Sequence, residues 1–381
     1  MFDLYSGNTP SRLNKEHFKG AVNWISSGEL KDHYIYSSKE QISEEAAKNL
    51  KLLPVGTFVI AIYGLEAEGV RGTGSITQEP STISQACMSF IPKGVIENEF
   101  LYSWYKKHGN MIGIRYAQGT KQQNLSYDIL EKFKIAYPNT KEQEKLNRFI
   151  SLLDERIATQ NKIIDKLKSL IKGLQDNLLD NPLWKKTYLR SFMQFYPTNS
   201  LSWEQLSYEE GEIRNLHYGL IHGFQTRGIN SASLPMIKNE AIPKQYTLCQ
   251  VGDVAFADAS EDTGEIAKSV EFVNTIEGDT ICGLHTIHGR DIKNRTVVGF
   301  KGFAFNSRYF HNQIKRLAQG TKVFSITANN LSSCYVYLPD LETQKAIVEL
   351  LKAYEAQLIV SRKTLKQYEK QKQYLLSQMF I

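Results

Sequence analysis

The stretches RYAQGTKQQNL (Arg115–Leu125) and RLAQGTKVFSI (Arg316–Ile326) decide how this chain is organised. They share the segment AQGTK and are displaced by 201 positions (316 − 115). The same displacement pairs Leu130 with Leu331, Pro138 with Pro339, Gln143 with Gln344 and Leu174 with Leu375. Self-similarity over such a length indicates two homologous halves in one polypeptide.

An earlier match extends the repeat towards the start of each half. PVGTFVIAIYG (Pro54–Gly64) resembles QVGDVAFADAS (Gln250–Ser260), with a displacement of 196. Apolar runs bounded by glycine predict β-strands here. FLYSWYKKHGNMIGI (Phe100–Ile114) and GFAFNSRYFHNQIKRL (Gly302–Leu317) have helical spacing. Each half therefore begins with a globular part of mixed α and β structure.

Each globular part is followed by one long amphipathic helix. Asn139 and Asp340 stand where N-caps are expected, and apolar residues then recur at steps of four and three. The polar layers Gln160 and Ser361 are equivalent, and Lys372 breaks the apolar seam of the second helix where the first has Ile171. The predicted seam comprises Leu146, Ile150, Leu153, Ile157, Gln160, Ile164, Leu167, Ile171, Leu174 and Leu178, then Ile347, Leu351, Tyr354, Leu358, Ser361, Leu365, Tyr368, Leu375 and Met379.

Such a heptad fits either an ordinary core helix or a coiled coil. The narrow stripe and the charged flanks favour a coiled coil, in which helices of about 40 residues reach roughly 60 Å. An antiparallel pair keeps the globular parts apart and gives approximate two-fold symmetry. We therefore predict an α+β protein with two similar mixed α/β domains separated by an antiparallel coiled coil. The expected segments are 1–138, 139–180, 181–339 and 340–381.

Composition limits the possible functions only weakly. The chain has 381 residues and a formal net charge of +6, which permits nucleic acid as a partner without arguing for it. Its four cysteines form no CxxC pair, so neither a disulfide framework nor a thiolate zinc site is expected. Without a secretory leader or an apolar run of about 18 residues, a cytoplasmic protein with no membrane contact is expected.

Motifs of catalysis are weak or missing. The sequence lacks the phosphate-binding loop G-x-x-x-x-G-K-[ST], and DNPLW (Asp180–Trp184) lacks the second proline of an amino-methyltransferase tetrapeptide. His285 and His288, with Asp279, Asp291 and Lys293, could imitate a metal-dependent nuclease. Residues i and i+3 of a strand point to opposite faces, so the two imidazoles would not share an ion. We predict no catalytic residue and no metal.

The doubled layout resembles the DNA-specificity subunit of type I restriction–modification systems. The likeness rests on two globular parts that each carry AQGTK and lead into a heptad helix, and on the turn GNTPS (Gly7–Ser11). It implies two target recognition domains that read a split site in double-stranded DNA. It also implies partners: two modification subunits that dock on the helices and carry S-adenosylmethionine, and a restriction subunit that joins through them. This chain itself would bind no cofactor.

In this interpretation, polar side chains on turns read DNA through phosphate and base contacts. For each of them the alternative is a solvated loop or a turn cap, and AQGTK could instead support the junction with the helix. The candidates are Thr9, Ser11 and Arg12; Arg71, Thr73 and Ser75 of RGTGSI, which is expected to be a flexible loop; Gln85; Gln118, Thr120, Lys121 and Gln123; and His222, Arg227, His285, Arg290, Gln319, Thr321 and Lys322.

The first half departs from the pattern at its start. FMQFY (Phe192–Tyr196) aligns with MFDLY at the N-terminus, so the strand expected at Trp184–Arg190 has no counterpart in the first half. Three explanations stay open: the start is displaced, the sequence is trimmed at its start, or the first domain closes without this strand and exposes a sheet edge. Two other function classes stay open: a coiled-coil scaffold for protein interactions without DNA binding, and a stand-alone nuclease or methyltransferase.

Overall fold

The computed structural model describes residues 2–67, 69–224, 228–229, 231–274 and 278–380. Two compact units divide the chain: Met1–Asn161 with Thr364–Ile381, and Lys162–Lys363. Each unit therefore includes part of both long helices. The division of the sequence into four domains stays a prediction.

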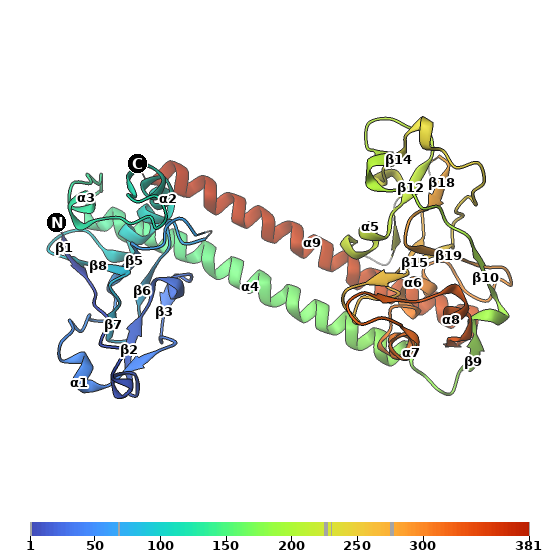
Figure 1. Cartoon of the computed structure of the whole chain (residues 1–381), viewed down its shortest axis with the longest axis horizontal. Helices are drawn as coiled ribbons and strands as arrows, with labels where there is room; N and C mark the ends of the chain where they lie inside the picture. Colours follow the sequence, from blue (N-terminus) through green and yellow to red (C-terminus); the bar gives the residue numbers. More distant parts are fainter. Residues whose placement is uncertain (1, 68, 225–227, 230, 275–277, 381) are drawn as a thin grey trace. The chain divides into compact units, whose positions relative to one another are not determined.

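The first unit is built on a five-stranded sheet with the order β1-β8-β5-β6-β3 (Figure 1). Neighbouring strands are antiparallel except β3 and β6, which are parallel. A smaller sheet has the order β4-β2-β7. The elements are β1 (Phe2–Ser6), β2 (Val22–Ile25), β3 (Tyr34–Ile35), β4 (Gln41–Ile42), α1 (Glu44–Ala47), β5 (Phe58–Ala61), β6 (Gly74–Thr77), β7 (Ser81–Ile83), β8 (Cys87–Pro92), α2 (Asn98–Tyr116) and α3 (Tyr127–Glu131).

The second unit repeats this topology. Its main sheet has the order β10-β19-β15-β17-β13, again with one parallel pair at the β13 edge, and its smaller sheet has the order β11-β14-β12-β18. The elements are β9 (Lys185–Tyr188), β10 (Met193–Tyr196), β11 (Leu206–Ser207), β12 (Arg214–Leu216), α5 (Tyr218–Gly223), β13 (Gly228–Ile229), β14 (Met236–Ile237), β15 (Val254–Ala257), β16 (Ala259–Ser260), β17 (Ser269–Phe272), β18 (Thr280–Cys282), β19 (Thr286–Asp291), α6 (Phe300–Ala304), α7 (Arg308–Leu317), β20 (Phe324–Ser325), α8 (Ala328–Ser333) and β21 (Tyr335–Leu338). The prediction of two similar mixed α/β parts is confirmed.

The long helices are α4 (Thr140–Leu179) and α9 (Leu341–Met379) (Figure 1). Asn139 caps α4 by accepting from the backbone N–H of Glu142 at 3.0 Å, and Asp340 caps α9 by accepting from that of Thr343 at 2.8 Å. Both caps were predicted, because short polar side chains satisfy the first free N–H groups of a helix.

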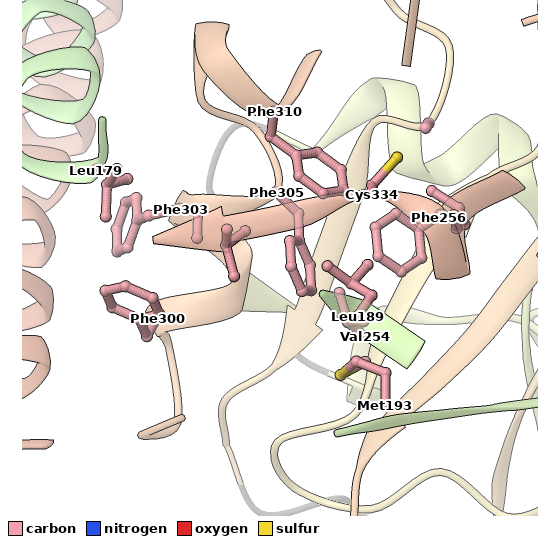
Figure 2. Packing of buried hydrophobic residues seen from close by; sticks show 14 of the residues in the cluster. Leu179, Leu189, Met193, Val254, Phe256, Phe300, Phe303, Phe305, Phe310 and Cys334 are labelled. Carbon is pink, nitrogen blue, oxygen red and sulfur yellow. The ribbon is translucent and has the colours of Figure 1, made fainter. Parts of the chain in front are cut away.

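Within each unit the two helices are antiparallel, as predicted. In the first unit, Ile150 near the start of α4 shares a core with Phe380 after the end of α9, and Asp154 pairs with Lys372. In the second unit, Leu179 at the end of α4 shares a core with Ile347 and Leu351 at the start of α9 (Figure 2 shows Leu179). Every residue of the predicted seam is buried or half-buried.

A buried glutamine fastens each globular part to its helix. Gln143 donates to the carbonyl oxygens of Val95 and Pro138, at 2.8 and 2.9 Å, and its own carbonyl accepts from the N–H of Glu97 at 2.9 Å. The same three bonds join Gln344 to Arg295, Pro339 and Val297. Because a buried amide that loses its partners is costly, these two bonded sets fix the helix start in each unit.

The end of α9 closes the core of the first unit. Phe380 is fully buried, and its ring centroid lies 5.1 Å from that of Phe100. Lys107 donates to the carbonyl oxygens of Phe380 and Ser377 at 2.6 and 2.7 Å. Residues about 280 positions apart thus complete one hydrophobic core.

Two local expectations were wrong. RGTGSI is not a flexible loop, because Gly74–Thr77 forms the buried strand β6 of the main sheet. The helix predicted over Gly302–Leu317 is divided into α6 and α7, because Ser307 caps a new helix by accepting from the N–H of Phe310 at 3.2 Å.

Candidate nucleic-acid interface

The repeated AQGTK segment forms the same turn in both units. In the first unit, Gln118 and Asn124 exchange two backbone hydrogen bonds of 2.9 Å. In the second unit, Gln319 and Ser325 exchange bonds of 3.0 and 2.8 Å. The repeat therefore encodes a closed turn that follows α2 in the first unit and α7 in the second.

Glycine is required at the bend of this turn. Gly119 has φ +111° and Gly320 has φ +129°, in the left-handed region that disfavours other residues. A Cβ atom would lie 2.0 Å from the carbonyl oxygen of Gln122 in the first unit and 1.9 Å from that of Val323 in the second. Part of the repeated motif is therefore explained by backbone geometry alone.

The polar side chains of the two turns are exposed. A ligand such as DNA could reach them without any change in the fold, so they stay candidates for contact. They are Gln118, Thr120 and Lys121 in the first unit and Gln319, Thr321 and Lys322 in the second.

Several other candidates of the first unit are already engaged with one another. The hydroxyl of Thr9 donates to the side-chain oxygen of Gln85, and Arg71 donates to that of Gln123 at 2.7 Å. The structure thus brings together residues that were predicted from separate segments. Two more stand apart from these pairs: Ser11 is exposed, and Arg12 is described next.

The predicted DNA contacts by Arg12, Thr73 and Ser75 need correction. Arg12 forms two bonds to Glu40, at 2.9 and 2.7 Å, and its guanidinium lies 4.6 Å from the ring centroid of Phe18, so it is partly committed to the fold. Ser75 is fully buried and donates to the carbonyl of Asp32 at 2.6 Å, which removes it from the candidates. Thr73 is half-buried and bonds its own turn.

In the second unit the candidate histidines each face a carboxylate. His222 Nδ1 lies 3.3 Å from Glu265 Oε2, and His285 Nδ1 lies 3.1 Å from Asp258 Oδ1. His285 is exposed on the turn before β19, with φ +54°. Arg227 lies outside the described residues.

Arg290 is bound to a buried carboxylate. Its Nε and Nη2 donate to Asp253 at 2.8 and 2.7 Å, and His288 Nε2 lies 2.7 Å from Asp253 Oδ2. Burial favours a raised pKa for Asp253, but the bonds from Arg290 and His288 outweigh it and hold the pKa of this carboxyl below its ordinary value. The role of Arg290 is therefore largely structural, and His288, being buried, does not converge with His285 on one ion.

We expect Asp253→Asn to lower the free energy of unfolding by about 2 kcal/mol at pH 7, because two charge-assisted bonds are weakened in a buried place. Since the folded pKa of Asp253 is lowered, its contribution is complete above the unfolded value of about 3.9 and is lost as pH falls through the folded value. Urea unfolding at several pH values should show the difference from wild type shrinking below about pH 4. A difference that does not depend on pH would contradict this assignment.

A thiol pair was missed by the sequence analysis because its cysteines are far apart in the chain. Cys249 Sγ and Cys282 Sγ lie 3.6 Å apart, and one ring nitrogen of His288 lies within 4.8 Å of both, so these side chains could hold a metal ion. The bond from Cys249, together with burial, raises the pKa of Cys282. In the first unit, Leu53 and Ile83 occupy the equivalent buried positions. This equivalence favours an apolar core role, and the absence of a metal stays a prediction.

A basic groove within the second unit was also missed. It encloses about 880 Å³ between α4, α5, α7 and α9 and contains His222 among its walls. Three acidic side chains, Asp176, Glu265 and Glu355, also line it. The six cationic ones are Lys168, Lys172, Lys268, Arg308, Lys315 and Arg362. The excess of cations favours an anionic ligand such as a phosphate backbone.

Among the described residues, no helix combines the length and the apolar character needed to cross a bilayer.

The family described as "Type I restriction modification DNA specificity domain" matches residues 1–169 and 283–370.

Curated relatives are named as specificity subunits of type I restriction enzymes. The chain is 29% identical over 174 residues to the MjaIX specificity subunit of Methanocaldococcus jannaschii, a match that covers 43% of this chain and 39% of the relative. It is 31% identical over 168 residues to the EcoR124I/EcoR124II specificity subunit of Escherichia coli, covering 43% and 40%. The chain thus spans about two-fifths of the length of these two relatives.

Solved structures share the fold over almost the whole chain. A type I restriction–modification S subunit from M. genitalium has a TM-score of 0.56 and 15% identity, covering 100% of this chain and 94% of that one. A second solved structure, from work on the complex assembly and conformational transition of the type I R-M system, has a TM-score of 0.61 and 15% identity. The match covers 93% of this chain and 90% of that one. The predicted architecture is therefore one that solved proteins adopt.

Proposed function

Because this chain belongs to the type I restriction–modification DNA specificity family, we propose that it is a non-catalytic subunit that reads a split site in double-stranded DNA. In this proposal each unit reads one half of the site. The chain itself transfers no methyl group and cuts no bond.

The observation that carries the proposal is the duplication of topology together with the duplication of the exposed AQGTK turn. Both main sheets have the same strand order, and each unit presents the same glycine-bent loop with exposed glutamine, threonine and lysine side chains. A split site needs two readers, and the residues after each AQGTK differ, QQNL against VFSI, as expected of readers for different bases.

Phosphate contacts would position the DNA, and side chains on the turns would read its bases. The basic groove of the second unit supports phosphate binding, because it holds six cationic side chains against three acidic ones. The exposed lysines Lys121 and Lys322 could add contacts beside the turns.

The partners that we propose are two modification subunits, which dock on the long helices and carry S-adenosylmethionine, and a restriction subunit that joins through them in the cytoplasm. Exposed apolar side chains on the helices support docking. Phe149 and Leu152 lie on α4, and Leu350 of α9 is the equivalent of Phe149 by the displacement of 201. Equivalent apolar positions on two helices suit two copies of one partner.

We expect the affinity for duplex DNA to fall steeply as salt rises, because binding to phosphates releases condensed cations. Titration of a duplex by fluorescence anisotropy between about 50 and 200 mM salt measures the slope of the logarithm of the association constant. Lys168→Ala and Lys172→Ala should each reduce that slope by about 1 and weaken all sequences alike. Lys293→Ala, exposed and not among the groove-lining residues, is the matched control.

Binding that does not depend on salt, or no binding to any duplex, would favour the scaffold without DNA contact. Methyl transfer or cleavage by the purified chain alone would instead establish an enzyme.

A further inference from the structure

His285 belongs to a set of backbone hydrogen bonds that ties it to the AQGTK turn of the second unit. The N–H of Asp258 donates to the carbonyl oxygen of His285 at 3.1 Å, and the carbonyl of Asp258 accepts from the N–H of Ile326 at 2.9 Å. Directly after Asp258, β16 pairs with β20, which closes the turn through Ser325. The segment at Asp258 therefore joins His285 to the end of the turn that we propose to read DNA.

The first unit has the same set of backbone bonds with different side chains. There the N–H of Ile62 donates to the carbonyl of Ala86 at 2.9 Å, and the carbonyl of Ile62 accepts from the N–H of Leu125 at 2.9 Å. Ile62 thus takes the place of Asp258, and Ala86 takes that of His285. A polar pair in one unit and an apolar pair in the other are expected where two related readers prefer different bases.

The hydrogen bond between the two side chains fixes the tautomer of the imidazole. His285 Nδ1 lies 3.1 Å from Asp258 Oδ1. A carboxylate oxygen only accepts, so Nδ1 carries the proton, and Nε2 of the neutral ring keeps a lone pair. Among the described residues none is hydrogen-bonded to this Nε2, and 50% of the His285 side chain is exposed. The pair therefore presents a hydrogen-bond acceptor at the surface.

The titratable groups that interact with His285, among the described residues, are Asp258, Tyr218 and His217. The ring of Tyr218 meets that of His285 edge-on, with centroids 5.2 Å apart. Burial lowers the pKa of His217, and the charge of His285 lowers it further, so His217 stays neutral beside it. Burial raises the pKa of Asp258, whereas His285 lowers it, so the histidine helps to keep this carboxyl ionised.

We propose that His285, with its tautomer set by Asp258 as a positioning residue, makes the second unit prefer adenine or cytosine at one position of its half-site. The lone pair of Nε2 accepts from the exocyclic amine of that base, because adenine N6 and cytosine N4 are the donors that base edges present in the major groove. Guanine and thymine present acceptors there, which repel a lone pair. This inference rests on the proposed DNA-reading function and adds to it the class of base that one residue reads.

Protonation should reverse this preference. Imidazole side chains gain a proton between about pH 8 and pH 5, and Nε2 then donates instead of accepting. An imidazolium favours guanine, because N7 and O6 of this base both accept in the major groove. We therefore expect the same position of the half-site to change from adenine or cytosine at about pH 8 to guanine at about pH 5.5.

The test selects duplexes from a random pool with the full chain at about pH 8 and about pH 5.5, and determines the preferred base at every position. Glycine adopts the φ of +54° at position 285 without strain. His285→Gly should therefore fold normally, and at the higher pH it should lose at least about fivefold of the discrimination at one position only. Unchanged preferences in this variant would overturn the inference and leave the proposed function untouched. A wild-type chain without any sequence preference would overturn both.

Asp258→Asn separates positioning from a purely structural role. An amide can donate to Nδ1 as well as accept from it, so the tautomer is no longer fixed, and discrimination at about pH 8 should fall at least about threefold. At about pH 5.5 both ring nitrogens carry protons, so the variant and wild type should discriminate equally. Glu261→Gln, which removes an exposed charge from the same segment, is the matched control and should change neither value. No loss at the higher pH, or an equal loss at both pH values, would overturn the positioning role.

Discussion

Replacing residues 1–138 with the equivalent part of another specificity chain is expected to change one half of the modified DNA motif and to leave the other half unaltered. The first unit has its own main sheet and its own core, so its reading side chains should act without the second unit. The replacement must keep an aromatic residue at position 100, because Phe380 packs against it. Mapping of methylated bases across the genome of cells that express the hybrid with its partner subunits measures both halves at once.

The reciprocal exchange of residues 181–339 is the control, and it should change only the opposite half of the motif. If either exchange altered both halves, the assignment of one reader to each unit would be wrong. If a hybrid abolishes all methylation, its helical content after purification shows whether the hybrid is misfolded or is folded but inactive.

The second large effect is expected at a buried ion pair in the second unit. Lys301 Nζ lies 3.0 Å from Glu271 Oε1, and both side chains are almost fully buried. Glu271 also accepts from the N–H groups of Gly299 and Gly302, at 2.9 and 2.7 Å, and Lys301 donates to Thr296 at 2.9 Å. Lys301→Met leaves a buried carboxylate without its cation and should lower the free energy of unfolding by about 3–5 kcal/mol.

Urea unfolding of the full chain measures this loss, with Lys293→Met at an exposed site as the matched control. The double variant Lys301→Met with Glu271→Gln removes the stranded charge while keeping an acceptor, so it should recover about 1 kcal/mol or more of the loss. Equal stability of the single variant and wild type would show that the pair contributes nothing to the fold.

The architecture was predictable because it depends on patterns that repeat along the chain. The AQGTK displacement identified two related units, since a turn that needs glycine at positions 119 and 320 leaves a fixed signature. The heptads identified α4 and α9, and the residues at their starts supplied the caps. Each of these signals is a local sequence pattern that occurs once in each half of the chain.

The candidate site was less predictable because its properties arise from contacts between distant segments. Arg290 was a plausible DNA contact from the sequence, but its guanidinium is bonded to Asp253. Ser75 was another, but its side chain is buried in β6. The basic groove combines residues of four helices, so no single window shows its charge. The pair of lysines one turn apart on α4, Lys168 and Lys172, was a local signal that could have indicated the groove.

The burial of Phe380 has a consequence for the order in which the polypeptide matures on the ribosome. The second unit ends at Lys363, whereas the first unit also includes Thr364–Ile381, which are translated after the whole of the second unit. Until this segment of α9 leaves the exit tunnel, the apolar surface around Phe100 in the nascent chain is not covered by Phe380. Residues 1–161 are therefore translated before the second unit but complete their core after it, and chaperone protection during translation is of most use there.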